Sequence, residues 1–329
     1  MKKHYSSIKN NINLMTSQMK AMRIREEFDL NQLPSPKAVR SLESCDSVPL
    51  FHEKYGVRHP RASYNVSLST IASRISTVVK ALTELHSLRL YLDPKNRNWE
   101  IPILEATDHM LDALMEHFDD CNKILKSLFP DPESKQWKKT FEQFKEDIQP
   151  YRDHVGKVVN FIKHNQGRLR IIIFYWETGT ALGYFVEGPI AGGGIGPSPL
   201  IHPNSNTAFS FNYDLSFHIS NIYAVSDCLS RLMETIDSRL APIDPKKATE
   251  EIKSDWKEMI VSVSGLPHIY FPDEIRKPIP LVSITPSKII IEYPSLRAKP
   301  KVIPNRTRIQ VNYRGDGVTK TFNLPYSHI

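Results

Sequence analysis

The stretch that decides the fold runs from Val155 to Trp176 and reads VGKVVNFIKHNQGRLRIIIFYW. As far as Ile162, apolar residues recur at steps of three and four, which is the spacing of one helix face. After Gly167 the period changes to that of a β-strand, and the apolar run from Ile171 to Trp176 has the length of one strand. The sequence therefore predicts that a helix ends near Gly167 and that a β-rich portion follows it.

Four apolar stripes at helical spacing precede Gly167. Four helices with one apolar stripe each bury those stripes most simply against one another, so an antiparallel bundle is expected over residues 65–169. We expect Pro150 to separate the third helix from the fourth. The predicted helices span residues 68–85, 111–128, 137–148 and 151–162.

Residues 1–64 are predicted to lie outside the bundle. Ile8, Ile12 and three methionines as far as Met22 share one stripe of a short amphipathic helix, which can dock on the bundle or on a partner protein. From residue 31 to residue 64 the periodicity fails and prolines are frequent, so a surface arm with little regular structure is expected there.

Residues 170–329 are predicted to mix strands and helices, which makes the fold class α+β. Two apolar runs within 171–186 flank a four-residue connection and predict a hairpin. The remaining predicted elements are a loop over 188–206, a strand over 209–213, helices over 217–238 and 247–260, and strands within 281–293 and 308–322. The last of these are predicted to form a terminal hairpin with Asp316-Gly317 at the centre of its turn. The chain is thus divided into segments 1–64, 65–169 and 170–329.

Composition places the chain among globular proteins of a reducing compartment. Of 329 residues, 40% are hydrophobic and 24% are charged, which are ordinary values for a folded protein. Three widely separated cysteines offer neither a disulfide framework nor the close cysteine pair of a structural zinc site. No apolar run is long enough to cross a membrane, and no secretory signal is recognised. A cytoplasmic protein without a membrane partner is expected.

The net charge of +7 is concentrated at the two ends of the chain. Residues 1–25 and residues 271–329 each contribute +6, so the long middle is acidic overall. Basic ends of this kind can contact phosphate backbones or anionic proteins, and they also serve as solvated surface charge.

The segment from Asn160 to His164, on the last predicted bundle helix, resembles the final helix of HEPN-fold proteins. This resemblance covers at most residues 65–170. It implies a helical bundle with an RNA-directed role, in some members as part of a defence or toxin system. In catalytic members, an Arg and a His on this helix act together: the His moves a proton and the Arg stabilises the charge on the phosphate.

Laying that pattern on this chain places His164 at the family histidine and Asn160 at the polar position that follows the arginine. The arginine position then falls on Val159, which cannot neutralise a phosphate. Arg152 lies about three helical turns before His164, and Arg168 lies after it. The candidate catalytic residues are therefore His164 with a displaced Arg168 or Arg152, and a non-catalytic relative is the preferred interpretation.

A phosphate-binding or RNA-binding role is open to Lys163, Asn160 and Arg170, which are close in sequence to His164. Cations at a helix C-terminus also stabilise the helix dipole without any ligand. The glycine-rich segment 188–199 lacks the Lys-Ser/Thr and the following helix that nucleotide-binding loops need, so no nucleotide cofactor is expected. The polar face of His109, Asp112, Glu116 and Asp120 is interpreted as solvated, and no metal site is predicted.

Three functions follow from these patterns. The preferred one is a non-catalytic HEPN-like binding or regulatory protein that contacts RNA. The second is a metal-independent RNA endonuclease that uses His164. The third is an assembly factor that binds a protein partner or a second copy through the bundle or the N-terminal helix.

Overall fold

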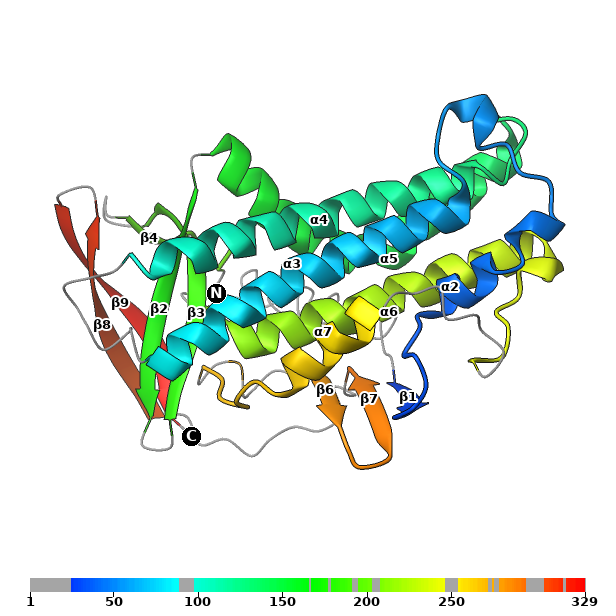
Figure 1. Ribbon diagram of the computed structural model, residues 1–329. Helices are drawn as coiled ribbons and strands as arrows, with labels where there is room; N and C mark the ends of the chain where they lie inside the picture. The colour runs from blue at the N-terminus through cyan, green and yellow to red at the C-terminus, as the bar shows by residue number, and fades with distance from the viewer. Residues whose placement is uncertain are drawn as a thin grey trace.

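The structure is a computed structural model in which four long helices run side by side, with one small sheet across an end of the bundle and another along its flank (Figure 1). It describes residues 25–88, 98–165, 167–176, 179–190, 195–202, 208–245, 254–271, 274, 278–293, 305–315 and 318–328. The α+β class predicted from the sequence is confirmed.

The helices and strands have the following bounds. The helices are α2 (Lys37–Leu42), α3 (Pro60–Leu88), α4 (Glu100–Lys126), α5 (Lys135–His164), α6 (Phe211–Ile236) and α7 (Ser254–Ser264), with 3-10 turns η1 (Cys45–Ser47), η2 (Glu53–Tyr55) and η5 (Ser238–Leu240). The strands are β1 (Arg25–Asp29), β2 (Arg168–Trp176), β3 (Gly179–Pro189), β4 (Ile195–Pro197), β5 (Phe209–Ser210), β6 (Leu281–Ile284), β7 (Lys288–Glu292), β8 (Asn305–Gly315) and β9 (Val318–His328).

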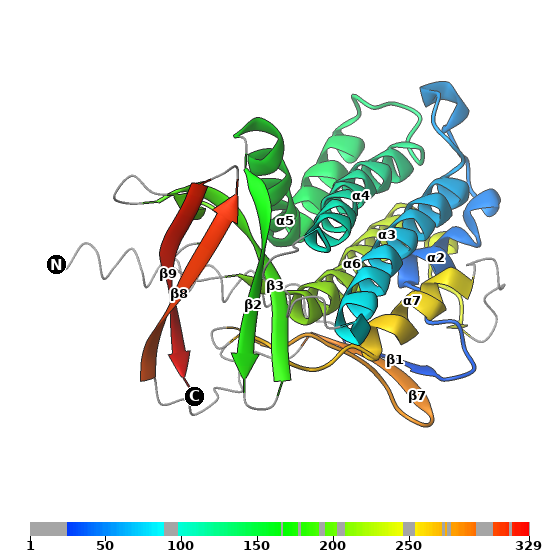
Figure 2. The same ribbon diagram turned by 60° about the vertical axis from the view of Figure 1, so that its left-hand side comes forward.

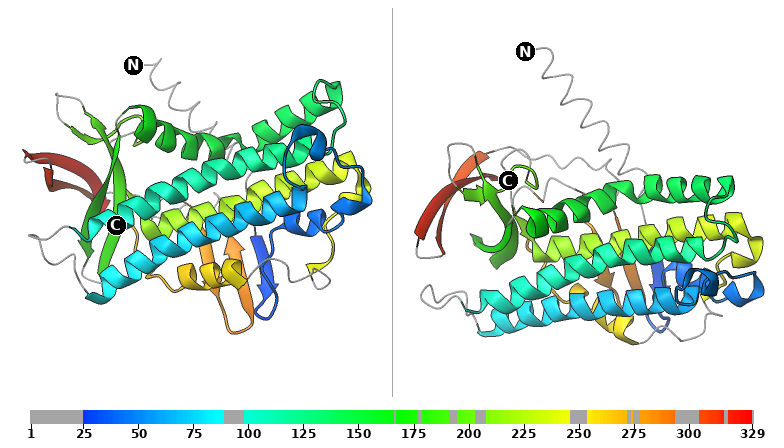
Figure 3. Two further views of the ribbon diagram at one scale, coloured as in Figure 1. Left: turned by 45° about the horizontal axis from the view of Figure 1, so that its top comes forward. Right: turned by 90° about the horizontal axis from the view of Figure 1, so that it is seen from above.

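The bundle consists of α3, α4, α5 and α6, arranged so that α4 packs on α3 and α5, and α6 packs on α5 (Figure 3). The predicted break at Pro150 is wrong, because α5 continues through it. A proline inside a helix removes one hydrogen bond and crowds the preceding turn. Here the buried side chains of Phe144, Ile148, Tyr151 and Val155 lie on both sides of it and hold the two halves on the same core. The fourth helix of the bundle is therefore α6.

The helix-to-strand boundary near Gly167 is confirmed. The backbone N–H groups of Asn165 and Gly167 both donate to the carbonyl oxygen of Phe161, which closes α5, and β2 begins at Arg168. A Cβ atom at residue 167 would lie only 2.5 Å from Cδ1 of Phe161. The turn between α5 and β2 therefore needs glycine, because the chain passes directly over the Phe161 ring.

Apart from β1, the described strands belong to the C-terminal half of the chain (Figure 2). The predicted hairpin over 171–186 is confirmed as β2 and β3, which pair antiparallel from Arg168 with Glu187 to Trp176 with Gly179; β4 and β5 also pair with β3. The predicted terminal hairpin is confirmed as β8 and β9, while its predicted turn at residues 316 and 317 lies outside the described residues. Strand β7 lies between β1 and β6 in a separate three-stranded sheet.

The arm predicted over residues 31–64 contains more regular structure than expected, because it includes α2, the turns η1 and η2 and the first residues of α3. Helix α2 packs on α6, where the backbone N–H of Ala38 donates to Ser226 Oγ at 2.8 Å and Ser41 Oγ lies 2.7 Å from Ser230 Oγ. Strand β1 pairs with β7 from the far end of the chain. These contacts join residues almost 200 positions or more apart, so local patterns could not indicate them.

The three sequence segments share one core. Its buried apolar residues form a cluster that extends from Phe28 on β1, through the bundle, to Ile291 on β7. The strand expected over 209–213 is only two residues long, because Ser210 caps α6 by accepting the backbone N–H of Tyr213. The predicted N-terminal helix lies outside the described residues, and so does the start of the helix predicted over 247–260, whose remainder is α7.

Stability is expected to fall on mild acidification because of His117 on α4. This side chain is fully buried, with Nδ1 2.8 Å from Ser67 Oγ, and burial lowers its pKa from 6.5 to about 4. Below pH 6.5, His117 is protonated in the unfolded chain but stays neutral in the folded protein. The free energy of unfolding should therefore drop by about 2 kcal/mol between pH 7 and pH 5. Urea unfolding of the wild type and His117→Gln tests this.

The His117→Gln variant should lose this pH dependence of the free energy of unfolding, whatever its own stability at pH 7. His109→Gln, which changes an exposed histidine of the same helix, is the matched control and should retain it. An equal slope for the wild type and His117→Gln would contradict the assignment.

Candidate functional site

The residues singled out from the sequence lie at the C-terminal half of α5 and the start of β2. Asn160, Lys163, His164 and Arg168 are exposed, and Arg152 and Arg170 are partly exposed. Residues 153, 157, 160 and 164 follow one another at steps of four, three and four, so they share one face of α5. This face is polar because the apolar residues of α5 turn toward the bundle.

A pocket of about 510 Å³ opens on this face of α5. It brings together two of the predicted residues, Arg152 and Asn160, while His164, Lys163, Arg168 and Arg170 do not line it. Its lining residues are Met115, Arg152, Asp153, Gly156, Lys157, Asn160, Phe161, Asn165, Leu200 and Ile201. Lys157 and Asn165 were not predicted from the sequence. Lys157 could have been, because it lies three residues before Asn160 on the same helix face. Asn165 lies just beyond the end of α5, where helical spacing gives no indication.

The charges in this pocket favour an anion. Neither Arg152 nor Lys157 forms an ion pair with any residue that the structure describes. The carboxylate of Asp153 is also in the pocket, where it accepts a hydrogen bond from Gln149 Nε2 at 3.4 Å. The amides of Asn160 and Asn165 add hydrogen-bond donors and acceptors. Two cations and two amides in one hollow suit a phosphate or a carboxylate group.

Two of the predicted phosphate-binding cations are held by acidic partners. Lys163 Nζ lies 2.7 Å from Asp112 Oδ1 on α4, and this hydrogen bond raises the pKa of Lys163. Arg170 on β2 pairs with Glu187 on β3. Both pairs join neighbouring elements at the junction of bundle and sheet, so Lys163 and Arg170 have an evident structural role.

His164 has no arginine beside it on α5. The family's arginine position falls on Val159, whose side chain is buried in the core. Arg152 is twelve residues from His164, which corresponds to about 18 Å along the helix axis. An acid–base histidine and a phosphate-stabilising cation must act on the same phosphate. Arg152 and His164 therefore cannot form such a pair.

The segment that follows β3 covers one side of the α5 pocket. Leu200 and Ile201 line the pocket, and Leu200 is 73% exposed. Two hydrogen bonds attach this segment to β3: Ser198 N–H donates to the Val186 carbonyl at 2.8 Å, and Val186 N–H donates to His202 Nε2 at 2.9 Å. Residues 191–194 of the glycine-rich loop lie outside the described residues.

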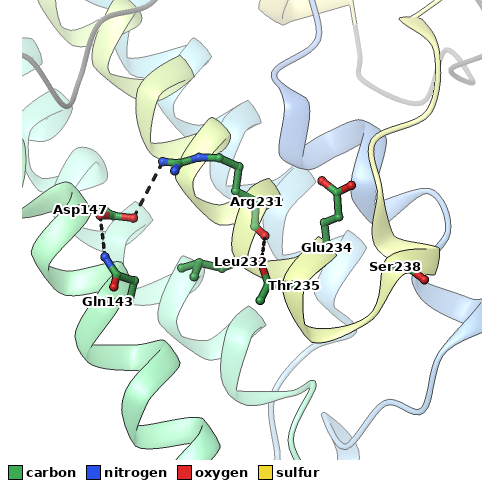
Figure 4. A pocket seen from close by; sticks show the side chains of 7 residues that line it. All are labelled: Gln143, Asp147, Arg231, Leu232, Glu234, Thr235 and Ser238. Carbon is green, nitrogen blue, oxygen red and sulfur yellow. Dashed lines mark hydrogen bonds and ion pairs between the residues drawn. The ribbon is translucent and has the colours of Figure 1, made fainter.

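A second pocket, of about 630 Å³, lies between α5 and α6, but its cation, Arg231, is already paired with carboxylates (Figure 4). Asp147 accepts a hydrogen bond from Gln143 Nε2 at 2.9 Å and lies 3.9 Å from the Arg231 guanidinium. Arg231 is also 3.2 Å from Asp227 on its own helix. Glu234 adds a further negative charge to the lining. This pocket does not favour an anionic ligand.

A buried polar group lies where α5, α6 and β3 meet. Asp214 Oδ2 accepts a hydrogen bond from Tyr184 Oη at 2.7 Å and lies 3.3 Å from His218 Nε2, and His218 Nδ1 lies 3.0 Å from Tyr151 Oη. All four side chains are almost completely excluded from solvent. No substrate can reach them in this conformation, so we assign them a structural role.

No family model, no curated protein sequence and no solved structure matches this chain, so the interpretation of the α5 pocket depends on its own residues. Among the helices of the described residues, none has the length and apolar character needed to span a membrane.

Proposed function

We propose that this protein binds RNA through the α5 pocket and does not cleave it. The observation that supports this most directly is the presence of two cations without ion-pair partners among the described residues, Arg152 and Lys157, beside two amides in one hollow. Charge-assisted hydrogen bonds to phosphate oxygens are the strongest contacts that such side chains make. The exposed side chain of Leu200 offers an apolar surface for a base.

Further features support the same proposal. The basic ends of the chain would attract a polyanion over a longer range and raise its association rate. The resemblance of Asn160–His164 to HEPN-fold proteins favours RNA as the polyanion and a regulatory or defence role. The absence of a cation at Val159 favours binding without cleavage. The buried free thiols Cys45, Cys121 and Cys228 suit a reducing compartment, and we place the protein in the cytoplasm.

RNA affinity should fall when the two pocket cations are removed. A hydrogen bond to a charged group contributes about 1.5–3 kcal/mol, so Arg152→Ala or Lys157→Ala should raise Kd about tenfold and the double variant about a hundredfold. Fluorescence anisotropy of a labelled single-stranded RNA at several salt concentrations measures this. The slope of log Kd against log salt should become shallower by about 0.7 for each phosphate that the variant no longer neutralises.

Lys139→Ala is the matched control, because Lys139 is an exposed lysine of α5 that does not line the pocket. It removes one charge from the same helix and should change Kd less than about twofold. If the double variant binds RNA as tightly as Lys139→Ala does, the pocket is not the RNA site. If neither the wild type nor any variant binds RNA, assembly with a protein partner becomes the better-supported function.

Incubation of the same labelled RNA with the wild type and His164→Ala tests the non-catalytic part of the proposal. No cleavage is expected from either protein. Cleavage by the wild type that disappears in His164→Ala would show instead that the protein is a ribonuclease.

A further inference from the structure

Three metal-ligating side chains meet where the N-terminal arm enters the bundle. Cys45 and Asp46 begin the turn η1, and His59 immediately precedes α3. The Cys45 Sγ atom lies 3.9 Å from His59 Nε2, and Nε2 lies 2.9 Å from Asp46 Oδ1. All three ligand atoms are within 4.8 Å of one another. This group is independent of the α5 pocket and has no part in the proposed RNA binding.

The geometry of these atoms suits a tetrahedral zinc ion. Zinc bonds of about 2.0–2.3 Å to nitrogen, oxygen and sulfur place neighbouring ligand atoms about 3.3–3.6 Å apart. Two of the observed separations, 3.9 Å and 2.9 Å, lie on either side of this range, and the third is at most 4.8 Å. Side-chain shifts of about 1 Å, chiefly of the Asp46 carboxylate, would seat the ion. Cys45 is buried, whereas the Asp46 side chain is 71% exposed, so an ion can enter from the solvent side.

His52 can supply the fourth donor if its side chain moves, because neither of its ring nitrogens lies within 4.8 Å of all three ligand atoms. The His52 ring stands nearly perpendicular to the His59 ring with their centroids 5.1 Å apart. The Nδ1 atom of His52 is buried and has no hydrogen-bond partner among the described residues. Buried polar atoms are normally hydrogen-bonded, so an unpartnered nitrogen on a ring that adjoins His59 is available for a metal ion.

We propose that the cluster of Cys45, Asp46, His52 and His59 binds one structural Zn²⁺ ion. A Cys-Asp-His-His set completes four-coordination with the ligand types that zinc prefers. The ion would join η1 to the first residue before α3 and so fasten the arm onto the bundle. The positive charge of Arg61 repels the ion only weakly, because the Arg61 guanidinium lies 3.9 Å from the Glu43 carboxylate. The ligands span fifteen residues and include one cysteine, so a search for cysteine pairs does not find them.

Metal binding is measured on the full chain after removal of metal with a chelator. Zn²⁺ is added in competition with a chromogenic zinc indicator, and the expected result is one ion per chain with a higher Tm in excess Zn²⁺. Substitution with Co²⁺ gives an independent reading. A thiolate-to-cobalt charge-transfer band together with tetrahedral d–d bands is expected, because Cys45 supplies sulfur.

Four variants locate the ion. Cys45→Ser and His59→Ala should lose it, while Asp46→Asn and His52→Ala should weaken its affinity at least about tenfold. Asp46→Asn changes an exposed carboxylate, so the variant remains folded and informative even if Cys45→Ser does not. Cys121→Ser is the matched control, because Cys121 Sγ also contacts a histidine, His117 Nε2 at 3.7 Å, but belongs to no group of three ligands among the described residues.

The zinc proposal is overturned if the wild type fails to bind a stoichiometric ion, or if Cys45→Ser and Asp46→Asn retain it with unchanged affinity. Unchanged affinity in His52→Ala alone would overturn the assignment of the fourth ligand. Loss of RNA binding by the α5 variants has no bearing on any of these outcomes, because those residues lie on a different helix.

Discussion

Replacing Asp214 with alanine is expected to lower the free energy of unfolding by about 3–5 kcal/mol, because it removes one partner of a buried pair. The carboxylate accepts the Tyr184 hydroxyl and lies beside His218, and none of these groups can turn to solvent. Without it, the Tyr184 hydroxyl and His218 Nε2 both remain buried without an acceptor. Urea unfolding followed by circular dichroism at pH 7 measures the change.

Asp214 should also make the free energy of unfolding depend on pH in the acid range. Burial alone would raise the pKa of Asp214, but the neighbouring His218 and the Tyr184 hydroxyl outweigh it and hold the pKa below its ordinary value. A carboxyl group with a lowered pKa in the folded state stabilises the protein above its ordinary pKa, and this contribution disappears as the pH falls through the folded-state value. The acid-side decrease due to this group should therefore be absent in Asp214→Ala.

Tyr184→Phe is the comparison variant for Asp214→Ala and should be less destabilising. It removes one hydroxyl and leaves the carboxylate beside His218, so a decrease of about 1–2 kcal/mol in the free energy of unfolding is expected. If Asp214→Ala costs no more than Tyr184→Phe does, the carboxylate does not hold this group of side chains together.

Truncation of Trp256 to alanine should also cost about 3–5 kcal/mol, because apolar surface is no longer buried and a cavity remains. This side chain on α7 is 1% exposed, and its Nε1 donates to Tyr223 Oη on α6 at 3.1 Å. The Tyr223 hydroxyl in turn donates to the carbonyl of Pro34 in the N-terminal arm. One aromatic side chain thus connects α7, the bundle and the arm.

The form of the unfolding curve is as informative as the size of this destabilisation. Because all three regions share one core, both the wild type and Trp256→Ala should unfold in a single transition. Trp137→Ala is the matched control: Trp137 is only partly buried at the start of α5, where it stacks on Phe141, and its truncation should cost less than about half as much. Two separate transitions in Trp256→Ala would show that α7 and the arm form an independent unit.

The candidate site was only partly predictable. Arg152 and Asn160 could be chosen from the sequence, and both line the α5 pocket. Leu200, which lines the same pocket, belongs to a segment forty residues after Asn160, and no helical spacing can indicate such a contact. The acidic partners of Lys163 and Arg170 could not be foreseen either, because Asp112 lies on another helix and Glu187 on another strand.

What the sequence determined by itself is the local structure: the helices of the bundle, the end of α5 at Gly167, and the hairpins β2–β3 and β8–β9. These follow from apolar spacing and from turn residues, which act over a few positions. Only the tertiary structure decided that α5 continues through Pro150, that α6 is the fourth helix of the bundle, and that the arm packs into the core. It also brought Cys45 to His59. These features depend on the burial of residues distant in sequence, and that free energy exceeds the local preferences of a proline or an irregular segment.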